Sequence, residues 1–149
     1  MNGEKQRQRY GEADVQRMAE NLLAAIHASD NRATVVGLTG ELGAGKTTLV
    51  KALAEILEVA EDVQSPTFVV MKTYQPNAGA FRKLVHMDAY RIDSEDELAP
   101  LRFAEILQEP DTLVVIEWPE RIEGALPEHA IRVSIDHDGD ARIITYAND

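Results

Sequence analysis

The sequence contains no cysteine among its 149 residues, which excludes disulfide bonds and thiolate metal sites. This composition fits the reducing cytoplasm. The sequence also lacks a long apolar run, since no stretch approaches the ~20 apolar residues that a membrane span needs. Residues 1–16 contain basic side chains with no apolar run after them, which is not the pattern of a secretory signal. We therefore expect a cytoplasmic protein without membrane contact.

Basic residues are scarce in the second part of the chain. Residues 93–149 contain 4 Lys and Arg against 15 Asp and Glu, whereas residues 1–92 contain 11 of each, and the net charge is −11. An acidic surface repels a nucleic-acid backbone, so nucleic acid is expected to be reached only through a partner. The alternative interpretation is that the acidity only keeps the protein soluble.

The apolar pattern predicts helices and buried strands in one domain, residues 1–149, with residues 1–10 as a flexible tail. An apolar stripe at three-to-four spacing predicts a helix that begins after Asp14, a plausible N-cap, and packs on a sheet. The apolar β-branched run at 33–39 predicts a buried strand, and a second helix is expected over 46–57.

The remainder of the chain predicts short strands and short helices. Two antiparallel hairpins are expected, one from strands at 68–74 and 83–90 and one from strands at 130–136 and 141–146, around a further buried strand at 112–116. Short helices are expected after a cap at Ser94, at 102–107 and at 119–126. Buried strands with helices between them indicate the α/β class, and the hairpins indicate a mixed sheet of about seven strands.

A glycine-rich segment follows the first buried strand. Residues 40–47, GELGAGKT, match the P-loop pattern G-x-x-x-x-G-K-[ST] without a mismatch. Glycines let backbone N–H groups converge on phosphates, and the following helix directs its positive end to the same place. The segment predicts a three-layer P-loop NTPase fold that binds ATP or GTP through Glu41, Leu42, Gly43, Ala44, Gly45, Lys46, Thr47 and Thr48. Lys46 is expected to reach the outer phosphates, and the Thr47 hydroxyl to bind magnesium.

An acidic residue at the end of a neighbouring apolar strand usually completes such a site. Glu117 directly follows the apolar run at 113–116, where ligands bind in sheets of this class. In the segment LVHMDAYR at 84–91, the strand period places His86, Asp88 and Tyr90 on one face, which we expect to line a cleft. Asp88 is a candidate to orient the attacking water, with help from His86.

Asp88 has an alternative role, because it can simply pair with Arg91. Another segment with two interpretations is Ser65-Pro66-Thr67, in which two hydroxyl groups flank a proline. It is either a switch loop that senses the outer phosphate or a plain turn that enters a strand.

Together these segments resemble the TsaE family, small bacterial ATPases of the tRNA threonylcarbamoyladenosine (t6A) pathway. The resemblance rests on GELGAGKTTL at 40–49, SPTF at 65–68, HMDAYR at 86–91 and IEWPE at 116–120, in an order that extends over residues 33–135. Two segments differ from the family: DELAPLRFAEIL lacks the usual Leu-Gly step, and the first ten residues are not similar.

The resemblance implies ATP as the nucleotide and Mg²⁺ as the cofactor, with the ion held by Thr47 and Glu117. It implies that Asp88, Lys46 and Glu117 are the catalytic residues and that Trp118 lies near the nucleotide. Ser65, Pro66 and Thr67 are then a mobile switch loop.

The resemblance also implies partners, the proteins TsaB and TsaD, of which TsaD transfers the threonylcarbamoyl group to adenosine 37 of tRNA. This chain would bind ATP and ADP, hydrolyse ATP weakly by itself, and reset the TsaB–TsaD complex, with tRNA contacted only through that complex. Two other functions stay open, a small-molecule kinase and a nucleotide-gated binding module in which hydrolysis is incidental. Motif chemistry does not separate ATP from GTP, although the absence of N-K-x-D favours adenine.

Overall fold

The computed structural model describes residues 5–41, 43–66 and 69–147. The strands are β1 (Lys5–Tyr10), β2 (Thr34–Thr39), β3 (Met71–Tyr74), β4 (Lys83–Asp88), β5 (Thr112–Glu117), β6 (Ile131–Asp138) and β7 (Ala141–Ala147). The α-helices are α1 (Val15–Ala25), α2 (Lys46–Ile56) and α3 (Phe103–Ile106), and the 3₁₀ segments are η1 (Glu12–Asp14), η2 (Glu95–Leu101) and η3 (Pro119–Ala125). No helix in the described ranges is long and apolar enough to cross a membrane.

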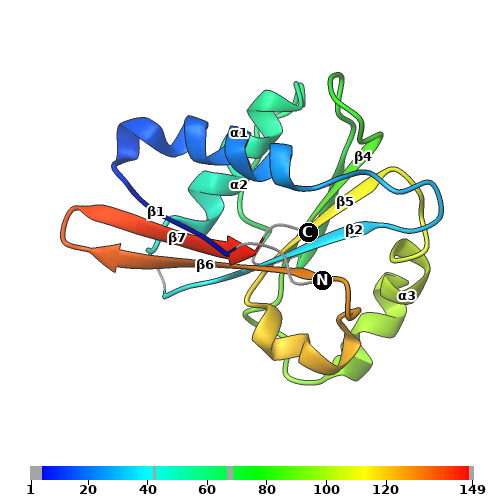
Figure 1. Cartoon of the computed structure of the whole chain (residues 1–149). Helices are drawn as coiled ribbons and strands as arrows, with labels where there is room; N and C mark the ends of the chain where they lie inside the picture. Colours follow the sequence, from blue (N-terminus) through cyan, green and yellow to red (C-terminus); the bar gives the residue numbers. More distant parts are fainter. Residues whose placement is uncertain (1–4, 42, 67–68, 148–149) are drawn as a thin grey trace.

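The seven described strands form one mixed sheet in the order β1-β7-β6-β2-β5-β4-β3 (Figure 1). The four central strands, β6, β2, β5 and β4, are parallel to one another, whereas β7, β1 and β3 pair with their neighbours in the antiparallel sense. The predicted mixed sheet of about seven strands is confirmed, and so are its two hairpins, β3–β4 and β6–β7.

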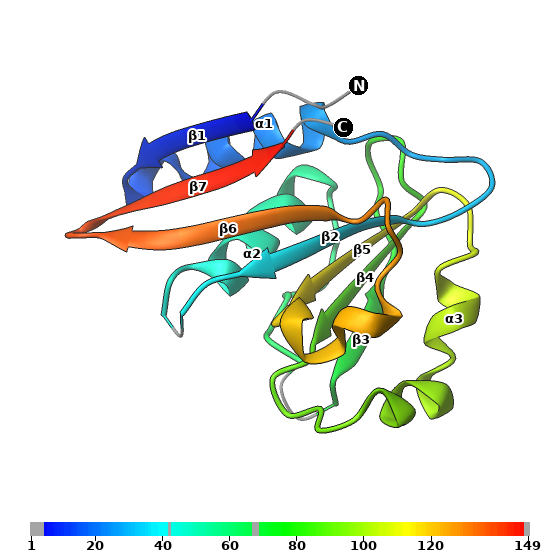
Figure 2. The same ribbon diagram turned by 60° about the horizontal axis from the view of Figure 1, so that its bottom comes forward.

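Helices cover both faces of the sheet, which gives the predicted three layers (Figures 1 and 2). Leu113 and Val115 of β5 pack into the cluster that contains the buried side chains of α1 and α2. Val114 and Ile116, which point the other way, pack with Phe103 of α3 and with the 3₁₀ segments. Because both faces are covered, β5 is apolar at successive positions and does not alternate.

The first helix packs on the sheet as expected, with Met18, Ala19 and Leu22 buried. Asp14 stands at its N-cap position, but its side chain makes no capping hydrogen bond. Its Oδ1 instead accepts a hydrogen bond from Arg17 at 2.7 Å, one turn into the helix. The predicted cap is therefore correct in position and wrong in its contact, because the nearby guanidinium competes for the carboxylate.

The prediction of a flexible tail at residues 1–10 is wrong for residues 5–10, and residues 1–4 lie outside the described ranges. Residues 5–10 form β1, which pairs with β7 from Lys5 opposite Ala147 to Tyr10 opposite Arg142. The side chains of residues 5–9 are exposed, and only Tyr10 is buried. Backbone pairing with β7 forms this edge strand, so no apolar pattern marks it in the sequence.

Several strands and helices begin or end at other residues than the sequence predicts. β4 ends at Asp88 and not at Tyr90, because the Asp88 carboxylate accepts a hydrogen bond from the Tyr90 N–H at 3.0 Å and turns the chain. β3 begins at Met71, and Thr67 and Phe68 lie outside the described residues. Ser94 caps the segment that follows it, as predicted, and it does so through a capping box with Glu97. That segment is a 3₁₀ helix containing Pro100.

Candidate functional site

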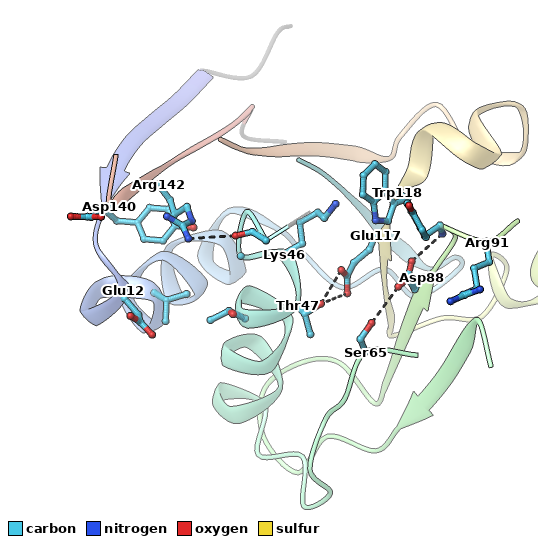
Figure 3. Close-up of a pocket in the computed structure, with 16 residues that line it drawn as sticks. Glu12, Lys46, Thr47, Ser65, Asp88, Arg91, Glu117, Trp118, Asp140 and Arg142 are labelled. Atoms are coloured by element: carbon cyan, nitrogen blue, oxygen red, sulfur yellow. Dashed lines mark hydrogen bonds between the residues drawn. The ribbon is translucent and has the colours of Figure 1, made fainter. Parts of the chain in front are cut away.

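The carboxyl ends of β2, β4 and β5 meet at one edge of the sheet. Glu117, the last residue of β5, lies opposite Asp88 at the end of β4 and opposite Leu38 near the end of β2. A cavity of about 470 Å³ opens at this edge, and Gly43 and Gly45 of the P-loop help to line it (Figure 3). The fold thus brings Thr47 into contact with Glu117, although these residues are 70 positions apart in the chain.

Two glycines explain how the P-loop folds. A Cβ at Gly40 would lie 2.5 Å from the Ile135 carbonyl oxygen of β6, so no side chain fits there. Gly45, directly before α2, has φ of 103°, a left-handed conformation that glycine adopts without strain. This turn begins α2 at Lys46 and directs the free N–H groups of its first turn toward the cavity.

The P-loop residues differ in how they meet the cavity. Gly43, Gly45, Lys46, Thr47 and Thr48 line it. The Glu41 carbonyl accepts a hydrogen bond from the Ala44 N–H at 3.0 Å, and the Ala44 methyl is buried under the loop. Leu42, also predicted to bind nucleotide, lies outside the described residues.

Lys46 is 5% exposed and folds back over its own loop. Its Nζ donates a hydrogen bond to the Gly40 carbonyl at 2.5 Å and lies 3.6 Å from the centroid of the Trp118 ring. Burial lowers the pKa of Lys46, and the acidic groups of Glu117, Glu120 and Asp88 oppose that shift. A cation with so little water around it is well placed to bind an anion that enters the cavity.

Thr47 and Glu117 are in direct contact. The Thr47 hydroxyl lies 3.0 Å from Oε1 and 3.1 Å from Oε2 of Glu117, and it donates its hydrogen to this carboxylate. Hydroxyl and carboxylate oxygens are ligands that Mg²⁺ prefers, and Mg²⁺ usually takes only one or two ligands from protein. The described residues contain no group of three or more His, Cys, Asp or Glu side chains that could hold a metal alone. The donor set therefore fits Mg²⁺ that reaches the protein with a phosphate and water.

Asp88 lines the cavity beside Glu117 and is 5% exposed. Its Oδ2 accepts a hydrogen bond from the Ser65 hydroxyl at 3.2 Å, and Oδ1 accepts the Tyr90 N–H. Ser65 thus contacts an acidic residue of the cavity, its role in a switch loop stays a prediction, and Thr67 lies outside the described residues. The Pro66 carbonyl accepts a hydrogen bond from the N–H of Val70, whose φ of 70° is unusual for a β-branched residue.

His86 does not line the cavity, which corrects the expectation that it shares a cleft face with Asp88 and Tyr90. Asp88 and Tyr90 do line the cavity. His86 is 0% exposed, and its Nε2 lies 2.6 Å from Oε2 of Glu117, on the interior side of that carboxylate. Because the ring is covered by protein, His86 has no access to a water in the cleft.

Trp118 directly follows Glu117 in the chain and lines the cavity. Its backbone has a left-handed φ of 59°, and its ring packs 5.0 Å from the Tyr90 ring, centroid to centroid. The Trp118 N–H donates to the Leu38 carbonyl at 3.3 Å, so this residue extends the β5 to β2 pairing by one position. The Trp118 ring lines the cavity beside Lys46, and its predicted place near the nucleotide stays a prediction.

A second wall of the cavity was not predicted from the sequence. It consists of Tyr10, Glu12 and Val15 from the amino-terminal segment and of Asp140 and Arg142 from the β6–β7 hairpin (Figure 3). These residues meet because β1 pairs with β7, and no local pattern signals that pairing.

Arg142 joins this wall to the P-loop. Its Nε donates to the Ala44 carbonyl at 3.0 Å, and one terminal nitrogen donates to the Gly43 carbonyl at 3.4 Å. These carbonyls belong to the P-loop, so the guanidinium braces that loop from the second wall of the cavity. Burial raises the pKa of the neighbouring Tyr10 hydroxyl, and the charge of Arg142 partly opposes that shift.

Comparisons with known proteins agree with this architecture. A family profile described as "Threonylcarbamoyl adenosine biosynthesis protein TsaE" matches residues 10–144. The tRNA threonylcarbamoyladenosine biosynthesis protein TsaE of Haemophilus influenzae is 36% identical over 123 residues, which are 83% of this chain and 74% of the relative. The proteins of the same name from Streptomyces coelicolor and Bacillus subtilis are 40% and 42% identical over 120 and 113 residues, covering 80% and 75% of this chain and 76% and 68% of each relative.

A solved structure is also similar to this chain over its whole length. The crystal structure of Bacillus subtilis YdiB aligns with a TM-score of 0.70 and 31% sequence identity, covering 100% of this chain and 88% of that chain. The matched profile includes the P-loop and both acidic strand ends described above. On these grounds the chain has a P-loop NTPase fold and belongs to the TsaE family.

Proposed function

We propose that this protein is an ATPase that acts in t6A modification of tRNA, in the cytoplasm. The observation that carries the proposal is the convergence of Lys46, Thr47, Asp88 and Glu117 on one end of a P-loop cavity. Curated relatives are named for tRNA threonylcarbamoyladenosine biosynthesis, which supports the same pathway for this chain.

In this proposal, the charged side chains of Lys46, Asp88 and Glu117 set the orientation of the bound nucleotide. Lys46, Asp88 and Glu117 stand at one end of the cavity, and this end suits the outer phosphates. Gly43, Gly45 and Thr48 line the cavity next to this end, and the backbone N–H groups of such a loop bind phosphates. The base then extends toward the opposite wall, where Tyr10 and Val15 offer apolar surface beside the flat guanidinium of Arg142.

Thr47 and Glu117, whose oxygens lie 3.0 Å apart, would hold the Mg²⁺ ion. The ion would supply positive charge that offsets the negative charge of the outer phosphates. The protein groups do the remaining work: Lys46 offsets charge on the same phosphates, and Trp118 covers Lys46 and limits the access of water to it. Because Thr47 is the second residue of α2, the helix fixes the position of its hydroxyl.

Asp88 is the proposed group that orients the attacking water. The Tyr90 N–H holds its Oδ1 and the Ser65 hydroxyl touches its Oδ2, so the carboxylate has a defined rotation at the cavity wall. A carboxylate that accepts a hydrogen bond from water directs a lone pair of that water at the phosphorus. Ser65 connects this carboxylate to the loop that includes Pro66, so closure of the switch loop and placement of Asp88 are linked.

The proposed partners are TsaB and TsaD, with tRNA reached only through them. An acidic protein is suited to dock on a basic protein face and unsuited to hold a nucleic-acid backbone. Of the net charge of −11, all the excess lies in residues 93–149. The chain would then use ATP binding and hydrolysis to reset the complex between rounds of transfer.

An Asp88→Asn variant tests this function against its two alternatives. The variant keeps the size of the side chain, so we expect it to bind ATP, to release phosphate at least ~100-fold more slowly and to fail in a cell that lacks the native protein. Full support of tRNA modification by the variant would instead indicate a nucleotide-gated binding module. Phosphate found on an acceptor molecule and not free in solution would indicate a kinase. A Glu120→Gln variant, altered at an exposed acid near the site, is the control.

A further inference from the structure

One buried polar side chain next to the site has no use in the proposed hydrolysis. The His86 ring is 0% exposed in the middle of β4, with Leu84 buried on the same face. Among the described residues, its Nδ1 has no hydrogen-bond partner. A buried ring nitrogen without a partner is unfavourable, and an apolar side chain would pack at this position without that defect. Packing alone therefore does not explain an imidazole here.

Within the part of the chain that the structure describes, the one polar contact of the ring is with Glu117. His86 Nε2 lies 2.6 Å from Oε2 of Glu117, and both side chains are buried, at 0% and 4% exposure. A carboxylate only accepts hydrogen bonds, so the Nε2 of His86 carries the hydrogen and donates it. A hydrogen bond between two buried groups, one of them charged, is strong and directional.

The strand register explains why the His86 ring contacts the Glu117 carboxylate from the interior of the sheet. His86 lies opposite Val115, two positions before the pair Asp88 and Glu117. The imidazole therefore lies one strand repeat deeper in the sheet than the acids, and its ring does not reach the cavity. Thr47 touches the same carboxylate from the P-loop side. Glu117 is thus held between a donor in the core and a donor at the start of α2.

We propose that His86 is a positioning residue that sets the rotation of the Glu117 carboxylate for Mg²⁺ and nucleotide. The inference rests on the proposed function, because it concerns the same magnesium site. Glu117 has three side-chain torsions, and Thr47 alone contacts both carboxylate oxygens almost equally. The bond from His86 distinguishes the two oxygens by fixing Oε2, which leaves Oε1 the freer of the two toward the cavity. Partners of this kind behind a metal ligand commonly change metal affinity ~10–100-fold.

Two substitutions separate this role from simple packing. His86→Leu keeps the volume approximately and removes the donor, whereas His86→Gln places an amide N–H close to the position of Nε2. Calorimetric titration with ATP, in EDTA and over a range of Mg²⁺ concentrations, measures binding without reference to turnover. Thermal unfolding of each variant reports on the fold. His129→Leu is the matched control, since this histidine contacts the Ala33 carbonyl and does not line the cavity.

For His86→Leu we expect a need for at least ~10-fold more Mg²⁺ to reach the same ATP affinity, with metal-free ATP binding and the unfolding temperature close to those of the parent. His86→Gln and His129→Leu should stay within about threefold of the parent, since one restores the donor and the other lies elsewhere. If His86→Leu does not fold, His86→Asn replaces it, because its amide is too short to reach Glu117 and should show the same loss.

The inference is overturned if His86→Leu, or Asn in its place, retains the parent's Mg²⁺ dependence. It is equally overturned if Leu and Gln lose metal-free ATP binding together with thermal stability, because that result indicates a packing role. A parent protein whose ATP affinity does not respond to Mg²⁺ gives a different result. It would refute the magnesium site of the proposed function itself, before any variant is compared.

Discussion

The ammonium group of Lys46 lies 3.6 Å from the centroid of the Trp118 ring while its hydrogen bond goes to the Gly40 carbonyl of its own P-loop. The cation thus has an aromatic face on one side and a backbone oxygen on the other. Both partners are weaker than a phosphate group would be. An incoming triphosphate is therefore expected to draw Lys46 away from the ring and to change the surroundings of Trp118.

This exchange of partners predicts a fluorescence signal. Trp118 is the one tryptophan in the sequence, so emission above that of tyrosine comes from this ring alone. Saturating ATP or ADP should change its intensity or wavelength because a quenching cation leaves and a nucleotide arrives. Inorganic tripolyphosphate, which has no base, should give part of the same change. An unaltered spectrum at saturating nucleotide would contradict the placement of Trp118.

Removal of the P-loop cation should abolish binding. In Lys46→Ala, no side chain offsets the charge of the outer phosphates inside a cavity with little water, so ATP affinity or turnover should fall at least ~100-fold. Because the ammonium group is buried, its loss should leave the thermal unfolding temperature similar or higher. Lys51→Ala, at an exposed position of the same helix, provides the comparison. Equal ATPase rates in all three proteins would refute the P-loop assignment.

Substitution of Glu117 should uncouple nucleotide binding from magnesium. Hydrolysis by the parent should stop in EDTA, and Glu117→Ala should lose most hydrolysis even at high Mg²⁺, since the carboxylate beside Thr47 is gone. ATP binding without metal should change little, because Lys46 and the loop N–H groups remain. The measurement is phosphate release over a Mg²⁺ titration, with Glu120→Ala as the neighbouring exposed control. Hydrolysis that persists in EDTA would exclude this role.

The second wall predicts a selective effect on the base. Val15→Phe adds bulk to the second wall, on the side of the cavity away from Asp88 and Glu117. ATP affinity should therefore fall about tenfold, while tripolyphosphate affinity stays close to that of the parent. Ala13→Phe places the same ring at an exposed position two residues earlier, outside the cavity, and should have little effect. Competition titrations measure both ligands. Equal losses for ATP and tripolyphosphate would place the base elsewhere.

The P-loop could be predicted, because the residues that define it lie close together in the sequence. The apolar run before Gly40, the glycine spacing and the helical period after Lys46 fix a strand, a turn and a helix within about 25 residues. Glu117 was found for a related reason, since a charged residue that ends a continuous apolar strand is unusual. The mixed sheet followed from the same apolar runs and from the turn residues of the two hairpins.

The remaining features could not be predicted, because they depend on contacts between segments that are distant in the sequence. β1 has exposed polar side chains at five of six positions, and its pairing with β7 comes from backbone hydrogen bonds that any sequence can make. The wall around Tyr10 and Arg142 was missed for that reason. His86 was placed on the correct face of β4 but in the wrong role, because the strand period does not tell how deep in the sheet a side chain lies.

The site is incompletely closed, which bears on its activity. Asp88 is held by Tyr90 and Ser65, and Lys46 covers one side of the phosphates. Tyr90, which lines the same cavity, is nevertheless 37% exposed. Hydrolysis of a phosphoanhydride needs an oriented water and a closed, neutralised site, and many P-loop proteins gain rate from residues that a partner supplies.

We therefore expect slow ATP hydrolysis by the isolated chain and a rise of at least ~10-fold when TsaB and TsaD are added together. Because residues 93–149 contain 15 acids and 4 bases, association with a basic partner face should weaken as salt rises from about 0.05 to 0.5 M. The stimulated rate should vanish in Asp88→Asn while complex formation persists, which separates catalysis from docking. Phosphate release, with and without partners at each salt concentration, measures both effects. An isolated chain that hydrolyses ATP rapidly and ignores both proteins would favour an autonomous hydrolase, because no step would then remain for the partners to complete.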